Sequence, residues 1–188
     1  MCRVKQIKRQ VVGGLLLVLL IGFIVAVPTL PLISAKPVSA SFLAPVKANK
    51  AVVFFGFRSC NKVCPITLST LANVINRFQS DGLDTTEQTN LPQVIFVDID
   101  SASDDDSALK FAQQYHPSFI GLHVSMAQLD YFSAQFGLNI NNQNGVLTHQ
   151  GRSYLLTRVD NERWILIKTF NPSGLTYQAL QAALSQGQ

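Results

Sequence analysis

The sequence has little net charge beyond its first nine residues, and this absence excludes one class of function. The 188-residue chain has 15 basic and 11 acidic residues, which gives a formal net charge of +4. Arg3, Lys5, Lys8 and Arg9 supply four of the basic residues, so the rest of the chain is balanced at 11 of each sign. A nucleic-acid-binding protein needs a basic face to contact phosphates. We therefore expect no nucleic acid among the partners.

Charge is also absent from Val11 to Ala35, a run of 25 mostly apolar residues behind the basic tip. Such a run is typical of a membrane segment, and it is longer than the ~7 to 15 residues of a signal-peptide core. We predict a cytoplasmic tip and a transmembrane signal anchor over residues 1–35, with a cleaved signal peptide ending near Ala40 as the alternative. With the positive end in the cytoplasm, the chain is expected to be a single-pass protein of the inner (cytoplasmic) membrane whose domain faces the periplasm.

Cysteine is scarce, with three residues in the chain. Cys2 falls on the cytoplasmic side, where we expect an idle reduced thiol. Cys60 and Cys64 lie in the segment FFGFRSCNKVCP, and Pro65 follows at a position where a helix can begin. Cys64 is therefore expected at or beside a helix N-terminus, whose positive end favours a thiolate, and this predicts a reactive or metal-binding cysteine. A purely structural disulfide is the alternative, although closing so short a loop removes little chain entropy.

The remainder of the chain indicates one α/β domain after a linker. Residues 36–50 contain two prolines and little periodicity, which predicts the linker, and the domain spans 51–188. Strands are expected at 51–57, 94–99, 154–159 and 164–169, and helices after Pro65, over 109–115, from Ser125 to Gly137 and after Thr176. The acidic run 104–106 is interpreted as a helix start, 119–122 as a connector and 139–145 as a loop. This order predicts a mixed sheet flanked by helices, which is a thioredoxin-like arrangement.

A metal held by the Cys-x-x-x-Cys pair would need a third ligand, and the chain has three histidines. His116 and His123 sit at element ends and are expected to be surface or packing residues. His149 precedes the first strand of the expected hairpin, a junction that faces the cysteine loop in a thioredoxin-like fold. Two thiolates and one imidazole suit copper(I), and with a water they suit copper(II), although zinc is also compatible with these ligand types. An uninvolved loop histidine is the alternative for His149.

The segment FFGFRSCNKVCPITLSTL resembles the signature of the Sco/SenC family, which are membrane-anchored, thioredoxin-fold copper-binding proteins that help assemble the CuA centre of cytochrome c oxidase. The similarity continues through VIFVDIDSASDDDSALKFAQQYHPSFIGLHVSMAQLDYFSAQFG and covers about Val52 to Leu184. It implies Cys60, Cys64 and His149 as copper ligands. It also implies three partners: the copper-bearing oxidase subunit, a thioredoxin-like reductant and a copper donor. Family members usually carry proline and aspartate where this chain has Asn61 and Lys62, so the loop loses a carboxylate and gains a cation.

Two functions from different classes follow from the cysteine pair. The first is a copper-binding assembly factor, a metallochaperone that requires no turnover. The second is an enzyme, a thiol-disulfide oxidoreductase in which Cys60 and Cys64 form the redox pair and reduce a partner's cysteines. The additional residue between the cysteines, compared with Cys-x-x-Cys, favours the metal. A thiol peroxidase is a weaker third hypothesis, because Arg58 alone does not supply the constellation that activates a peroxidatic cysteine.

Overall fold

The computed structural model describes Gly14 and residues 36–81, 91–138, 140–143, 146–148, 150–160 and 163–186. Ala35–Gln188 forms one compact unit. The anchor predicted over residues 1–35 lies outside the described residues, Gly14 excepted. Within the described part of the chain, no helix has the length and apolar character needed to cross a bilayer.

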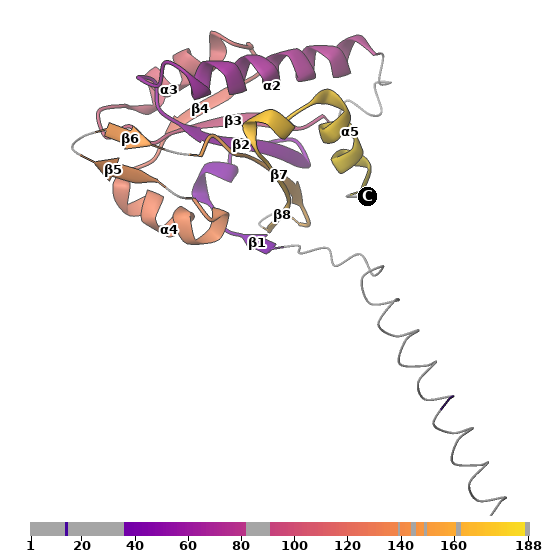
Figure 1. Ribbon diagram of the computed structural model, residues 1–188. Helices are drawn as coiled ribbons and strands as arrows, with labels where there is room; N and C mark the ends of the chain where they lie inside the picture. The colour runs from indigo at the N-terminus through magenta and orange to yellow at the C-terminus, as the bar shows by residue number, and fades with distance from the viewer. Residues whose placement is uncertain are drawn as a thin grey trace, which may run out of the picture. The chain divides into compact units, whose positions relative to one another are not determined.

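The domain is built on a six-stranded mixed sheet with the order β1-β8-β7-β2-β3-β4 (Figure 1). Its strands are β1 (Lys36–Val38), β2 (Lys50–Gly56), β3 (Gln93–Asp98), β4 (Ile120–His123), β7 (Ser153–Arg158) and β8 (Trp164–Phe170). The strands β2, β3 and β4 run parallel, whereas β7 is antiparallel to β2 and β8, and β1 is antiparallel to β8. A second small sheet pairs β5 (Asn141–Gln143) with β6 (Val146–Thr148). The predicted mixed sheet is confirmed.

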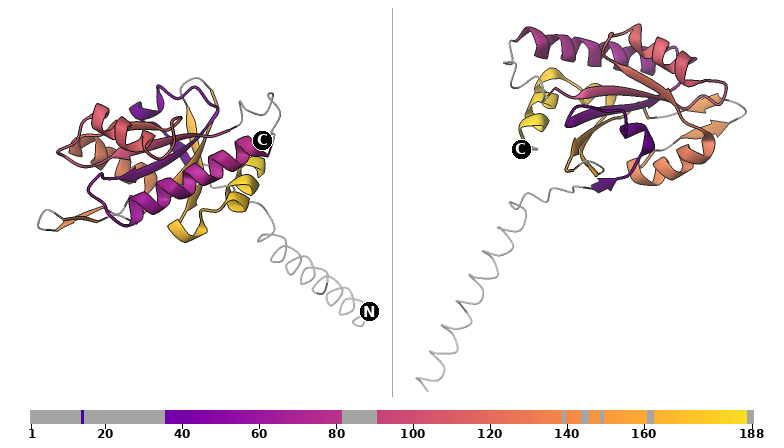
Figure 2. Two further views of the ribbon diagram at one scale, coloured as in Figure 1. Left: turned by 90° about the horizontal axis from the view of Figure 1, so that it is seen from above. Right: turned by 180° about the vertical axis from the view of Figure 1, so that it is seen from behind.

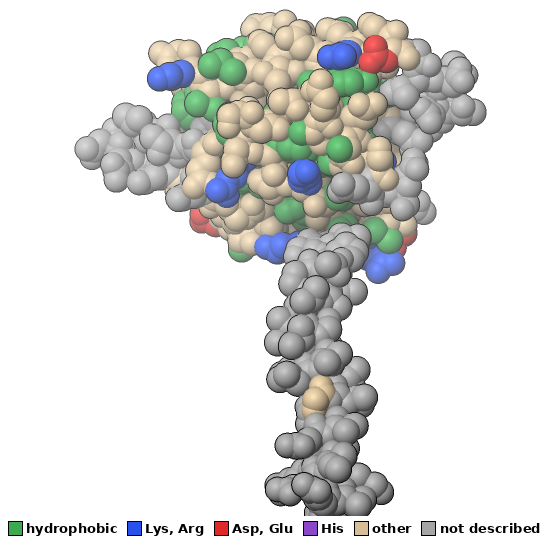
Figure 3. All heavy atoms as spheres, turned by 45° about the vertical axis from the view of Figure 1, so that its right-hand side comes forward, with side chains coloured by type: hydrophobic (Ala, Val, Ile, Leu, Met, Phe, Trp, Pro, Cys, Tyr) green, Lys and Arg blue, Asp and Glu red, His purple; other side chains and the backbone are tan. Residues whose placement is uncertain are grey.

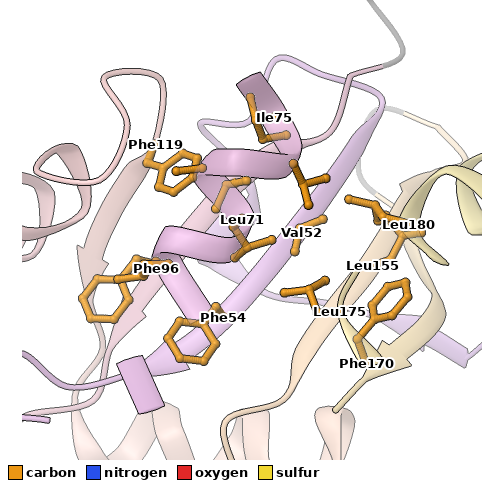
Figure 4. Close-up of a cluster of buried hydrophobic side chains, with 14 of the residues drawn as sticks. Val52, Phe54, Leu71, Ile75, Phe96, Phe119, Leu155, Phe170, Leu175 and Leu180 are labelled. Atoms are coloured by element: carbon orange, nitrogen blue, oxygen red, sulfur yellow. The ribbon is translucent and has the colours of Figure 1, made fainter. Parts of the chain in front are cut away.

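Helices cover both faces of this sheet (Figures 1 and 2). One face carries α2 (Val63–Ser80), α3 (Asp105–Gln113) and α5 (Tyr177–Gln186), and the other carries α4 (Met126–Phe136) and the short η2 (Ser41–Leu43). Side chains alternate along a strand, so Val52 and Phe54 of β2 belong to the first core and Val53 and Phe55 to the second. Figure 4 shows the first core, in which Leu71 of α2 lies over the sheet. Every residue of β2 is buried, as the continuous apolar run predicts.

The helix boundaries follow the expected local chemistry. The N–H of Ser107 donates to the Asp104 side chain at 2.7 Å, so the acidic run begins α3. Ser125 and Gln128 form a capping box at the start of α4, and Gly137 ends that helix at a φ of 61°. The helix predicted after Pro65 is α2, and it buries an apolar stripe at helical spacing: Leu68, Leu71, Ala72, Ile75 and Phe78.

The linker predicted over residues 36–50 is wrong for most of its length. Strand β1 pairs with β8, and Phe42 is buried against the rings of Phe55, Phe132 and Phe136. Lys50 is also buried as the first residue of β2, and its Nζ donates to the Leu184 carbonyl at 2.7 Å. The apolar residues of this segment show no periodicity in the sequence, yet four of them are buried in the second core: Val38, Phe42, Leu43 and Val46. Residues 36–50 therefore belong to the folded unit, which does not begin at residue 51.

Two further segments differ from the expectation. The connector predicted at 119–122 contributes β4, which forms one edge of the sheet and is parallel to β3 because α3 provides the crossover between them. The loop predicted at 139–145 contains β5 and begins the small hairpin with β6. Both strands are too short for alternation to be visible in the sequence.

Charged side chains are dispersed on the face drawn in Figure 3. Lys and Arg side chains lie singly there, among hydrophobic and uncharged polar groups. This face has no concentrated field of one sign.

Candidate functional site

The two cysteines meet where β2 runs into α2. Strand β2 ends at Gly56, the Cys60 N–H donates to the Phe57 carbonyl at 3.1 Å, and α2 begins at Val63. The first helical turn then brings its N–H groups back toward the loop, and the Cys64 N–H donates to Cys60 Sγ at 3.5 Å. The sulfur of Cys60 therefore caps the helix that contains Cys64. The two sulfur atoms are not joined to each other.

The two thiols have opposite environments. Cys64 is fully buried in the first core, and this burial raises the pKa of its thiol far above the ordinary value. Cys60 is only partly buried. Burial acts to raise its pKa, but hydrogen bonds from the backbone N–H groups of Cys64, Lys62 and Val63 and from the Cys64 thiol together outweigh it. They hold the pKa of Cys60 below the ordinary value. The prediction that the helix N-terminus favours a thiolate at Cys64 is therefore wrong, because burial raises the pKa of Cys64 more than its neighbours lower it. The helix N-terminus lowers the pKa of Cys60 instead.

Gly56 makes the close packing around Cys64 possible. A Cβ on Gly56 would lie 2.8 Å from Cys64 Sγ and 3.0 Å from the rings of Phe54 and Phe96. A side chain at this position would push the thiol away from the end of β2. The absence of a side chain at Gly56 therefore allows the Cys64 thiol to pack against the end of β2.

Asp98 is a site residue that the sequence interpretation missed. It ends β3 directly beside Gly56 in the sheet register, and its side chain has no exposed surface. Ser103 Oγ donates to Oδ2 at 2.6 Å, and Arg58 Nε lies 3.3 Å from the same oxygen. Burial raises the pKa of Asp98, with Ser103, the Asp100 N–H and Arg58 acting in the opposite direction. The Arg58–Asp98 ion pair links the cysteine loop to the end of β3. In the sequence, the only indication of this role is an acidic residue at the end of an apolar run.

The histidines separate into one packed residue, one strand residue and one undescribed residue. His116 is buried, with Nδ1 2.7 Å from Ser118 Oγ and Nε2 3.1 Å from Asn76 Oδ1, so it is a packing histidine as predicted. His123 ends β4, and its N–H donates to Asp105 Oδ1 at 2.7 Å. His149 lies outside the described residues. Within the part of the chain that is described, no group of three His, Cys, Asp or Glu side chains could hold a metal.

Gly151, two residues after His149, lies against the cysteine loop. Its φ is 62°, and a Cβ at this position would overlap Val63 Cγ1. Val63 is the neighbour of Cys64 and the first residue of α2. Figures 1 and 2 accordingly show the β5–β6 hairpin beside the start of α2. The chain that follows His149 is thus held at the same end of the sheet as the two thiols.

Comparison with known proteins identifies the family of this chain. The family model for SCO1/SenC matches residues 43–183. The chain belongs to the SCO1/SenC family. An SCO2-like protein of Rickettsia conorii is 28% identical over 119 residues, which cover 59% of this chain and 55% of that protein. The chain therefore spans about half the length of this SCO1/SenC relative, and the predicted family is confirmed.

Solved SCO1/SenC structures share the fold. The solution structure of apo Sco1 from Thermus thermophilus superposes with a TM-score of 0.62 at 25% identity, and it covers 84% of this chain and 94% of that one. ScoI of Arabidopsis thaliana, crystallised with copper bound, superposes with a TM-score of 0.59 at 19% identity, over 74% of this chain and 85% of that one. The helix-flanked mixed sheet is the arrangement common to all of them.

Proposed function

We propose that this protein is a copper-binding assembly factor that holds one copper ion through Cys60, Cys64 and His149. The observation that carries the proposal is the convergence at the start of α2. The Cys64 N–H reaches Cys60 Sγ at 3.5 Å, and Gly151, two residues beyond His149, packs on Val63 beside Cys64. The two sulfur atoms of the proposed ligands are thereby adjacent, and Gly151, two residues beyond the proposed third ligand, is held next to them.

Two thiols and one imidazole are better suited to binding copper than to forming a structural disulfide. Soft thiolates select copper(I) or zinc over hard cations, and an added imidazole gives a three-ligand set that can accept a water in the copper(II) state. The N–H groups at the start of α2 already favour a Cys60 thiolate. Cys64 must release its proton when a metal binds, because a thiolate is the ligand. Copper is cargo in this proposal, so a site with one open ligand position suits its exchange.

The copper acceptor in this proposal is the copper-bearing subunit of cytochrome c oxidase. A copper donor would load the site, and a thioredoxin-like reductant would keep both thiols reduced before loading. The uncharged run of 25 residues behind the basic tip supports a single-pass anchor in the inner membrane, with the domain on the periplasmic side. Ligand exchange between adjacent sites would then deliver copper without turnover.

The contrast between the two thiols favours a second candidate function, a thiol-disulfide oxidoreductase. An accessible cysteine of lowered pKa is suited to attack a partner's disulfide, and a buried one of raised pKa is suited to resolve the mixed disulfide. This activity requires neither His149 nor copper.

Replacing His149 separates the two candidates. We expect the reduced native chain, purified in detergent, to retain one copper after dialysis, and His149→Ala to retain little. Dithiol reduction of a model disulfide should proceed in both proteins. A His123→Gln variant controls for loss of a histidine elsewhere at this end of the sheet. Equal copper retention by the native and His149→Ala proteins would exclude His149 as a ligand, and no retention by either would leave the oxidoreductase as the function.

A further inference from the structure

Lys62 stands between the two cysteines, and none of the described acidic residues neutralises its charge. It is the residue directly before α2, its side chain is exposed, and it makes no ion pair in the part of the chain that the structure describes. It lies between Cys60 and Cys64 in a loop that is closed by the Cys64 N–H donating to Cys60 Sγ at 3.5 Å, so its Cα lies close to that sulfur. An exposed lysine with no ion-pair partner among the described residues therefore stands beside the accessible thiol.

The charged side chains of Arg58 and of the residues that follow β3 have interaction partners of their own. Arg58 is paired with the buried Asp98. The carboxylates that follow β3 and begin α3 each accept a hydrogen bond: Asp100 from the Ala102 N–H, Asp104 from the Ser107 N–H, Asp105 from the His123 N–H and Asp106 from Lys110. None of them pairs with Lys62. The positive end of α2, an 18-residue helix, adds to the lysine charge at this point.

An exposed apolar side chain lies close in sequence to the two cysteines. Ile66 lies in the first turn of α2, two residues after Cys64, and 61% of its surface is exposed. Ser59 and Asn61, the sequence neighbours of Cys60, are also exposed. The accessible surface of the cysteine loop and the first turn of α2 therefore offers a partner one cation and one apolar side chain.

We propose that Lys62 selects protein partners whose own thiols are flanked by carboxylates, with Ile66 supplying an apolar contact at the rim. Lys62 is thus a specificity-determining residue of the cysteine site. The inference deepens the proposed function, because it names the kind of partner face that exchanges copper or electrons at that site, and it rests on such an exchange taking place. Opposite charges at close range accelerate encounter and suppress partners of the wrong sign.

Thiol-disulfide exchange reports this selection directly. The Cys60 thiolate attacks one sulfur of a peptide disulfide, the peptide S–S bond breaks, and one peptide leaves as a thiolate that takes up a proton. Cys64 then loses its proton and attacks the Cys60 sulfur, which forms the protein disulfide and releases the second peptide thiol. The protein dithiol loses two electrons and the peptide disulfide gains them.

The test compares two short peptide disulfides that differ only in whether Glu or Lys flanks the cysteine. The ratio of their rates with the reduced, copper-free full chain cancels any change in the intrinsic reactivity of Cys60. At low ionic strength we expect the Glu peptide to react roughly threefold to fivefold faster, and the ratio to approach one at about 0.5 M salt. Lys62→Glu should invert the ratio, and Lys62→Arg should keep it.

Lys47→Glu is the matched control, because Lys47 is an exposed lysine that precedes β2 at the opposite end of that strand from the cysteine loop. It should leave the ratio unchanged. A ratio of one in the native chain, or a ratio that Lys62→Glu does not move, would overturn the inference. Copper stoichiometry, measured on the same proteins after copper loading, distinguishes failure of this inference from failure of the proposed function. Partner selection can fail while copper is bound, and copper binding can fail while partner selection persists.

Discussion

The Cys64 N–H donates to Cys60 Sγ at 3.5 Å, so one helix buries the second thiol and holds the first at its positive end. Burial of Cys64, together with the hydrogen-bond donors around Cys60, makes the two cysteines chemically unequal. Cys64 is enclosed between Gly56 and the apolar side of α2, whereas Cys60 keeps access to solvent. A copper ion or a disulfide partner would therefore first meet Cys60 and engage Cys64 second.

The first prediction concerns the order in which the thiols ionise. In the reduced, copper-free chain, the rate at which iodoacetamide modifies Cys60 should reach half its maximum at a lower pH than for cysteine in a short peptide. The reason is that N–H donors stabilise the Cys60 thiolate. Cys64 should remain unmodified across the same pH range, because burial raises its pKa. Peptide mapping by mass spectrometry separates the two. Preferential labelling of Cys64 would contradict this account.

Replacing the buried Asp98 should destabilise the protein more than replacing an exposed aspartate. Asp98→Asn keeps the shape but loses the charge that Arg58, Ser103 and the Asp100 N–H satisfy, so we expect the free energy of unfolding to fall by about 1 to 3 kcal/mol. Asp130→Asn, at an exposed position of α4, should change it by less than about 0.5 kcal/mol. Urea unfolding followed by circular dichroism measures both. Equal effects of the two substitutions would exclude a structural role for the Arg58 pair.

Much of this architecture is readable from the sequence, because its signals are local. Four of these signals depend on neighbours a few residues apart: the apolar run of β2, the α2 stripe, the Asp104 cap and the Ser125 capping box. The strand and the three helices to which they belong were predicted. The roles of Cys64 and Asp98 depend on distant parts of the chain. Burial of the thiol requires the packed core around α2, and Asp98 reaches the site only through the register of β3 with β2.

Gly151 offers a sharper test of the site geometry. Gly151→Ala adds a side chain where φ is 62° and the Cβ overlaps Val63, so it should cost about 1 to 3 kcal/mol of stability and weaken copper retention. Gly137→Ala has nearly the same φ of 61° with nothing near its Cβ, and it should show only the smaller backbone cost.

The double variant Gly151→Ala/Val63→Ala isolates the contact. Removing the Val63 methyl groups should recover part of the copper retention lost in Gly151→Ala, because the overlap is relieved. Strictly additive effects of the two substitutions would show that the Gly151–Val63 approach does not position this part of the chain.

The segment before β2 should prove essential to the fold. Phe42→Ala removes a buried ring that contacts three other aromatic rings, those of Phe55, Phe132 and Phe136, so we expect a loss of about 3 to 5 kcal/mol. Ser41→Ala, at the exposed neighbouring position, serves as the control and should be nearly neutral. If thermal unfolding shifted equally little in both variants, residues 36–50 would behave as the linker that composition alone predicts.

The most direct measurement is the X-ray absorption spectrum of the copper(I)-loaded full chain, recorded beside that of His149→Ala. The account predicts two sulfur ligands and one imidazole nitrogen in the native protein, with the nitrogen contribution absent from whatever copper the variant retains. A native spectrum with sulfur ligands alone, or one that His149→Ala leaves unchanged, would contradict a copper site formed by Cys60, Cys64 and His149.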